Sequence, residues 1–249
     1  MRLVELLQTP VWTTAAAKAR LVVDLGSGTG ACGLAAAALG STHVLLTDVA
    51  DLVPVLERNA AKNVGMLAAL HGSTGGCTID STALTWAEQP AGPITTVPAL
   101  AHGAGMVLMS DCLNAIYGER HALELAATLA ELLRRAAAHG DPQPVGLMSQ
   151  TPRKSEFTEA LFFEACATLG LTSTEVTRSA FPKRPQKAPK GPKRPRPPAA
   201  GGSHDAAAAA GAAANMPQQG VYARPAGDDS TDLFEQAATV RLYVLQLSS

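Results

Sequence analysis

The chain has 249 residues, of which 47% are hydrophobic and 16% are charged, a composition typical of one globular domain with or without a disordered segment. Its net charge of −1 conceals a separation: seven of the 20 basic residues lie between Lys183 and Arg196, which leaves 13 basic against 21 acidic residues elsewhere. Four scattered cysteines and the lack of a long apolar run argue against a zinc site, a disulfide framework and a membrane-spanning helix.

These features also bear on where the protein works. The N-terminal residues 1–10 lack the apolar core of a signal peptide, and the cysteines are typical of a reduced compartment. We therefore expect a cytoplasmic protein, with a nuclear location as the alternative. The basic run is a candidate nuclear-localisation signal or a contact for an acidic partner, and a solvated insertion without a role is the other interpretation. It contains no aromatic residue, so nucleic-acid binding is not expected.

Apolar patterning predicts strands and helices in alternation along most of the chain, which is typical of an α/β fold with a parallel sheet. Continuous apolar runs predict buried strands, and 3.6-residue periodicity predicts helices. A loop is expected over 89–104, where three prolines fall. The expected strands are 21–25, 43–47, 78–84, 105–110 and 145–149, and the expected helices are 31–39, 51 to about 63, 119–139 and one from Ser155 to before Gly170.

Two further strand-like segments, 172–180 and 239–247, have no predicted helix between them, so they are expected to form an antiparallel pair at the edge of the sheet. What separates them is a basic, proline-rich run followed by an alanine tract, a composition that cannot supply a packed core. The predicted organisation is thus a core over 1–181, a disordered insertion over 182–230 and a last core strand within 231–249.

A glycine-rich turn is the strongest local signal. Gly28, Gly30 and Gly33 match the dinucleotide fingerprint, but in that fingerprint the strand ends just before the first glycine, and here Leu25 is already followed by Gly26. The better frame is an acidic residue followed by three alternate glycines. A carboxylate about 20 residues beyond such a turn suits a ribose diol, so an adenosine-containing cofactor is expected. The residues of this frame are Asp24, Gly26, Gly28 and Gly30, with Asp48 as the later carboxylate.

This frame resembles motif I of the class I S-adenosylmethionine-dependent methyltransferases. Other short segments are similar to one branch of that class, the methyltransferase-like-21 group of protein-lysine methyltransferases, also called family 16. The resemblance covers about 10–180 and 237–247. The segments that carry it are Pro10-Val11-Trp12, Thr47-Asp48-Val49, Leu56-Glu57-Arg58-Asn59 with Asn63, Leu84-Thr85-Trp86, Ser110-Asp111-Cys112-Leu113, and Phe162-Phe163 with Cys166.

The resemblance implies a Rossmann-like seven-stranded sheet, mostly parallel with a C-terminal antiparallel hairpin. It also implies that the protein binds S-adenosylmethionine and methylates a lysine of a protein substrate. The expected roles are as follows: Trp12 and the Gly26-Ser27-Gly28 turn contact the methionine half of the cofactor, Asp24 helps to hold its ammonium, Asp48 binds the ribose, Trp86 lies by the adenine, Ser110 lines the pocket, and Asp111 begins a D-x-x-Y motif that positions the lysine.

The chain departs from the family pattern at two places. Asn114 stands where the motif has tyrosine, although Tyr117 follows three residues later. Asparagine can still bond an amine, which makes Asn114 a catalytic candidate beside Asp111. Only nine residues separate Trp12 from Val22, so the N-terminal cover over the pocket is expected to be short or the sequence incomplete there.

Four of the site residues also have a purely structural interpretation. Trp12 and Trp86 could serve only in packing, Asp48 could cap the end of its strand, and Asp111 could cap the following helix. The six histidines show no paired spacing and are expected to be exposed. Two other functions remain open. One is methylation of a small molecule or another side chain, which Asn114 leaves available. The other is a partner-binding protein that has the methyltransferase fold and no activity.

Overall fold

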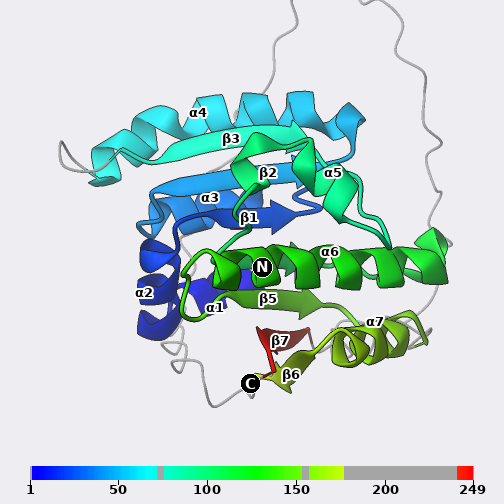
Figure 1. Ribbon diagram of the computed structural model, residues 1–249. Helices are drawn as coiled ribbons and strands as arrows, with labels where there is room; N and C mark the ends of the chain where they lie inside the picture. Colours follow the sequence, from blue (N-terminus) through cyan, green and yellow to red (C-terminus); the bar gives the residue numbers. More distant parts are fainter. Residues whose placement is uncertain (1, 72–75, 153–156, 177–239, 249) are drawn as a thin grey trace, which may run out of the picture. The chain divides into compact units, whose positions relative to one another are not determined.

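The computed structural model describes residues 2–71, 76–152, 157–176 and 240–248 (Figure 1). The predicted insertion over 182–230, its basic run and the predicted cap Ser155 lie outside these residues, so those predictions stay predictions. Within the part of the chain that is described, no helix has the length and apolar character needed to span a membrane.

One seven-stranded sheet carries the fold, in the order β3-β2-β1-β4-β5-β7-β6. The first five strands pair in parallel, while β7 runs antiparallel to both of its neighbours. This confirms the predicted mostly parallel sheet with a C-terminal antiparallel pair. The strands are β1 (Val22–Leu25), β2 (His43–Asp48), β3 (Thr78–Ala83), β4 (Met106–Ser110), β5 (Val145–Gln150), β6 (Leu171–Glu175) and β7 (Arg241–Leu247).

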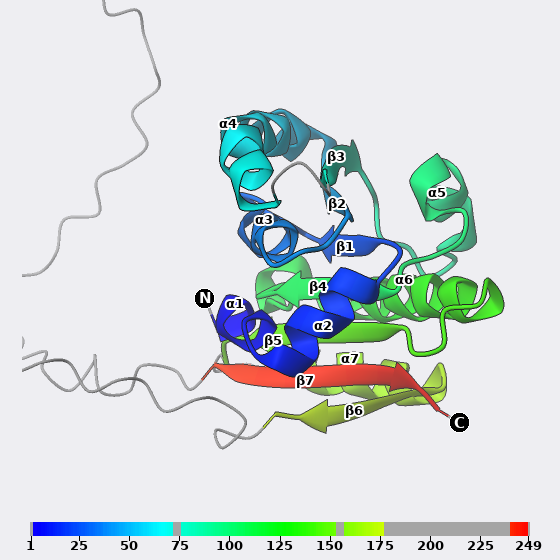
Figure 2. The same cartoon turned by 90° about the vertical axis from the view of Figure 1, so that its left-hand side faces the viewer.

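Helices cover both faces of the sheet (Figure 2), which is why the central strands are apolar at consecutive positions rather than at alternate ones. On one face, Val22, Val44 and Leu108 pack against the first four helices, and on the other, Val23, Leu45 and Met109 pack against the last three. The first group is α1 (Arg2–Leu7), α2 (Pro10–Lys18), α3 (Ala31–Ala38) and α4 (Val53–His71), and the second is α5 (Ala91–Thr95), α6 (Glu119–Ala138) and α7 (Phe157–Thr168).

Two segments differ from the sequence-based expectations. Helix α4 continues eight residues past Asn63 to His71, because 64–70 contains mostly good helix formers and Leu67 is buried. The segment 89–104 was expected to be a loop, but it contains α5 and the 3₁₀ turn η3 (Pro98–Leu100). Its prolines fall in the first turns of these elements, where a missing N–H costs nothing, and Ile94 and Leu100 are buried.

The parallel arrangement determines where a site can form. Because β1 to β4 all point the same way, the residues that follow them meet at one edge of the sheet. The chain reverses its direction of strand addition between β1 and β4, since β2 and β3 lie on one side of β1 and β4 and β5 on the other. In open α/β sheets, ligands bind outside the carboxyl ends of the strands at such a switch point.

Candidate functional site

The glycine turn between β1 and α3 adopts backbone conformations that favour glycine. Gly26, Gly28 and Gly30 have φ values of 62°, 58° and 81°, all in the left-handed region. A Cβ atom at Gly26 would also lie 3.1 Å from Cζ2 of Trp86, so the absence of a side chain there leaves the turn open beside the indole ring. Gly30 caps the N-terminus of α3.

Asp48 ends β2 and closes this turn. Its Oδ2 accepts a hydrogen bond from the Gly28 N–H at 2.7 Å, and its Oδ1 accepts one from the Val49 N–H at 2.8 Å. The carboxylate is partly exposed, so it can also accept bonds from a ligand. The spacing of 20 residues seen in the sequence thus corresponds to direct contact between the turn and the next strand.

Asp24 and Ser27 lie beneath the turn rather than on the surface of a cavity. The Asp24 carboxylate is buried and accepts a bond from the Gly33 N–H of α3 at 2.8 Å. Burial raises the pKa of Asp24 to about 7; the Gly33 bond opposes this shift and the nearby Asp48 carboxylate adds to it. The Ser27 hydroxyl lies 2.6 Å from the Asp24 carbonyl and accepts a bond from the Thr47 N–H at 2.9 Å. Both side chains therefore shape the turn from below.

A cavity of about 570 Å³ lies at the carboxyl ends of β1, β2, β3 and β4. This volume is within the range of roughly 300–1,000 Å³ typical of small-molecule sites. It is lined by Gly26, Gly28, Asp48, Val49, Leu52, Leu84, Thr85, Trp86, Ser110, Asp111, Cys112, Tyr117, His121 and Glu124.

Three rings form one wall of this cavity. The His121 ring lies between those of Trp86 and Tyr117, with centroid distances of 4.6 and 4.9 Å. Burial lowers the pKa of His121 below its usual 6.5, while the Glu124 carboxylate and a hydrogen bond with the Cys112 backbone act in the opposite direction. His121 is therefore neutral at pH 7. Sequence reasoning missed it because its contacts come from the tertiary approach of α6 to the segment after β3.

The end of β4 and the residue that follows it also line the cavity. The Ser110 hydroxyl lies 3.1 Å from that of Ser149. Asp111 has a φ of 58°, which is costly for a residue with a side chain, and its backbone N–H bonds the Ser149 carbonyl at 2.7 Å. Its Oδ1 also accepts a bond from the Thr151 N–H at 3.3 Å. The neighbouring β5 thus holds the conformation that presents Asp111 to the cavity.

Two predicted site residues lie elsewhere. Asn114 caps the 3₁₀ turn η4 (Ala115–Tyr117) by accepting a bond from the Ile116 N–H at 3.2 Å, and it is not among the cavity-lining residues. Trp12 lies on α2 and packs into the cluster formed with α1 and α3, so the structure matches its packing interpretation. Asn114 caps because its short side chain reaches its own turn, and Tyr117 lies in the lining instead.

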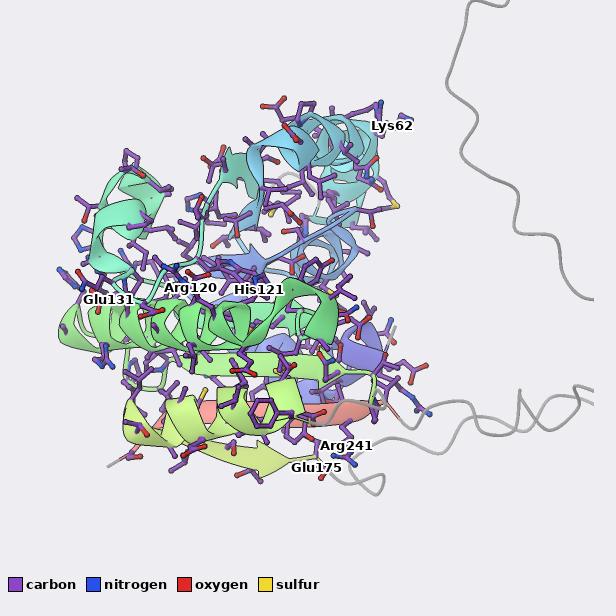
Figure 3. The ribbon with its side chains drawn as sticks, turned by 90° about the vertical axis from the view of Figure 1, so that its right-hand side faces the viewer. Lys62, Arg120, His121, Glu131, Glu175 and Arg241 are labelled. Carbon is purple, nitrogen blue, oxygen red and sulfur yellow. The ribbon has the colours of Figure 1, made fainter. Side chains whose placement is uncertain are left out.

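The charged side chains that line the cavity are acidic: Asp48, Asp111 and Glu124. Arg120 precedes the lining residue His121 on α6 (Figure 3). Its charge is already paired, since its Nε lies 2.9 Å from Glu124 and 3.4 Å from Glu88. Among the described residues, no group of three or more histidine, cysteine or acidic side chains is arranged to hold a metal ion. The cavity therefore favours a ligand with positive charge.

The comparison with protein-family models matches residues 3–165 to the family described as lysine methyltransferase. The chain belongs to the lysine methyltransferase family. This match spans well over half of the chain and covers both the glycine turn and the segment after β4. It confirms the resemblance to the family 16 lysine methyltransferases, whose cofactor is S-adenosylmethionine.

Solved structures with this general layout include other methyltransferases. An O-methyltransferase family protein from Burkholderia thailandensis is 15% identical with a TM-score of 0.47, over 72% of this chain and 53% of that one. A ribosomal protein L11 methylase from Lactobacillus delbrueckii subsp. bulgaricus is 18% identical with a TM-score of 0.39, over 63% and 64%. The O-methyltransferase of neocarzinostatin biosynthesis, in complex with S-adenosylmethionine, is 17% identical with a TM-score of 0.42, over 66% and 45%. This chain thus spans about half to two thirds of the length of these solved chains.

The residues that form this cavity fit S-adenosylmethionine, the cofactor of the family. Gly26 leaves a space beside the Trp86 ring, and a Cβ atom at this position would narrow that space. Asp48 lies at the turn with a partly exposed carboxylate. Acidic lining suits a ligand that carries a sulfonium and an ammonium group. Of the predicted cofactor residues, Gly26, Gly28, Asp48, Trp86 and Ser110 line the cavity, whereas Asp24, Ser27 and Gly30 support it and Trp12 lies apart.

Proposed function

We propose that this chain transfers a methyl group from S-adenosylmethionine to a lysine side chain of a protein. The observation that carries the proposal is the cavity itself: an acidic and aromatic lining at the carboxyl ends of four parallel strands, with the exposed residues Asp111 and Tyr117 as part of it. The family match supports the lysine as acceptor.

The cofactor, when bound, supplies an activated methyl group on a sulfonium sulfur. The chain's own part is to bind and orient. Asp48 offers a carboxylate to ribose hydroxyls, and Trp86 offers an aromatic surface beside the Gly26 turn. Together they fix a ligand against the ends of β1 and β2.

The acceptor amine requires little acid–base machinery, because an uncharged amine attacks carbon directly once it is aligned. Asp111 stands at the cavity, held by β5, and can accept a hydrogen bond from the amine. It thereby orients the amine and stabilises the positive charge that develops on nitrogen. The apolar and aromatic lining restricts water around the reacting atoms.

The testing experiment is a calorimetric titration with S-adenosylhomocysteine, followed by incubation with methyl-labelled cofactor and a cell lysate. The proposal expects micromolar binding and label in a protein band that acid hydrolysis traces to methyl-lysine. Label confined to small molecules or to another side chain would replace it with the first alternative. Intact binding without any transfer would favour a non-catalytic binding protein.

A further inference from the structure

Exposed apolar side chains gather at the edge of the sheet that carries the cavity. Val49 follows β2, Ile116 and Tyr117 follow β4, and Phe157 begins α7 after β5. Their exposed fractions are 59%, 77%, 59% and 57%, high values for large apolar groups. Single exposed hydrophobic residues are ordinary, but a group of them beside a concave site indicates an interaction surface. We call these four residues the apolar rim.

Three of the four residues of the apolar rim adjoin the cavity. Val49 and Tyr117 belong to the cavity lining, and Ile116 is the neighbour of Tyr117 in η4. Because Val49 and Tyr117 both line the cavity and stand exposed, a chain segment that places one side chain into the cavity beside them lays its adjacent residues over the rim. Burying an apolar neighbour there would remove exposed surface from both partners.

The charges around the rim restrict which segment fits. Asp48, Asp111 and Glu124 line the cavity, and the Arg120 guanidinium is already within 3.4 Å of two glutamates. Figure 3 shows the other labelled cations toward opposite borders of the sheet: Lys62 on α4, and Arg241 on β7, where Arg241 lies 3.6 Å from Glu159. A basic segment is attracted to this edge and an acidic one is repelled.

We propose that the apolar rim docks a segment of the substrate protein in which apolar side chains flank the target lysine and further residues are basic. This inference rests on the proposed function, since it assumes that the lysine enters the cavity. It adds a recognition rule: the sequence around the lysine is selected by apolar contacts at Ile116, Tyr117, Val49 and Phe157 and by the acidic charge of the cavity.

The test uses the full chain and three short fluorescein-labelled peptides, with binding followed by fluorescence anisotropy in the presence and absence of S-adenosylhomocysteine. The first peptide has a central lysine between leucines, with arginines outside them. The second replaces the leucines with serines, and the third replaces the arginines with glutamates. We expect the first to bind at least about tenfold more tightly than either of the others.

Two substitutions locate the contact. Ile116→Ser removes the most exposed rim side chain and should weaken binding of the first peptide by about three- to tenfold, the scale for partly burying one isoleucine. Leu70→Ser is the matched control, because Leu70 is 59% exposed on α4, outside the rim and the cavity lining, and it should leave binding unchanged. Thermal unfolding of both variants checks that each remains folded.

The proposal is overturned if no peptide binds, if the serine or glutamate peptide binds as tightly as the first, or if Ile116→Ser behaves like Leu70→Ser. A wild-type dimer that Ile116→Ser converts to a monomer in light scattering would show that the rim binds a second copy instead. Calorimetry with S-adenosylhomocysteine on the same samples distinguishes failure of the proposed function from failure of the docking proposal. Loss of cofactor binding refutes the proposed function, whereas failure of peptide selectivity with the cofactor bound refutes only the docking rule.

Discussion

At the scale of single residues, the two tryptophans take different places although both fall in segments that match the family. Trp86 lies on the cavity wall against Gly26 and His121, and Trp12 packs on the other face of the sheet with α1 and α3. Asp48 likewise serves two purposes, since it closes the glycine turn and faces the cavity. Three predictions belong to this scale, and they concern Asp48, the two tryptophans and the buried Asp24.

Asp48→Ala should weaken binding of S-adenosylhomocysteine by about 1.5–3 kcal/mol, because a ligand loses a charge-assisted hydrogen bond and the Gly28 N–H loses its partner. Calorimetric titration measures the change. The matched control is Asp51→Ala, an exposed acid in the 3₁₀ turn η1 (Ala50–Leu52) that follows β2. Equal affinity in wild type and the Asp48 variant would exclude Asp48 from the cofactor site.

The two tryptophans should differ when replaced: Trp86→Ala should mainly weaken cofactor binding, and Trp12→Ala should mainly lower the stability of the fold. The first removes an aromatic surface from the cavity and should cost about 1–3 kcal/mol of cofactor binding. The second removes a half-buried side chain that packs against a buried cluster, so it should lower the free energy of unfolding by about 1–3 kcal/mol with cofactor affinity retained. Calorimetry and denaturant unfolding on both variants decide this, and a loss of affinity confined to Trp12→Ala would reverse the assignment.

Asp24 should make stability depend on pH. Its pKa in the folded protein, about 7, lies above the unfolded value of 3.8, so the folded state binds more protons between these pH values. Stability therefore falls as pH rises from about 4 to 7, by up to about 1.4 kcal/mol per pH unit, and the loss is complete above pH 7. Asp24→Asn keeps an acceptor for the Gly33 N–H and should remove this slope. Denaturant unfolding from pH 5 to 8 measures the difference between the two proteins, and parallel curves would contradict it.

At the scale of elements, the close contact between α3 and the sheet depends on Gly33, which has no side chain to hold the helix away from the strands. A Cβ at Gly33 would overlap Cδ2 of Leu46 and approach Val44 and Asp24, so α3 lies directly on β1 and β2. This close approach also brings the Gly33 N–H to Asp24. The third glycine of the dinucleotide fingerprint has this same packing role, so the match of Gly33 to that fingerprint reflects the close contact of α3 with the sheet and does not by itself indicate a pyrophosphate.

Gly33→Ala should lower the free energy of unfolding by about 1–3 kcal/mol, because the added methyl group forces α3 away from the strands. Gly65→Ala in α4 is the matched control: nothing lies within 4 Å of a Cβ there, and alanine favours helix by about 0.5–1 kcal/mol. Denaturant unfolding should show opposite signs for the two variants. Stabilisation by Gly33→Ala would mean that α3 is not held this closely.

At the scale of the whole molecule, β6 and β7 pair directly although 177–239 separates them in the sequence. Deletion of 183–230 should therefore leave the core folded, since the residues on either side, 176–182 and 231–240, can join two antiparallel neighbours. Thermal unfolding of the shortened chain should retain a cooperative transition near the wild-type temperature. Loss of that transition would mean that the deleted residues stabilise the core.

The amino-acid sequence was enough to predict the α/β fold, the glycine turn and its carboxylate, because these depend on local periodicity, on backbone conformations that favour glycine and on spacing along the chain. Only the tertiary structure decided that His121 enters the cavity wall, that Asn114 caps its own turn, that Trp12 packs away from the site and that Ile116 stands exposed beside it. Which side chains face the cavity depends on how α2, η4 and α6 approach the sheet, and these approaches are set by contacts between residues far apart in the sequence.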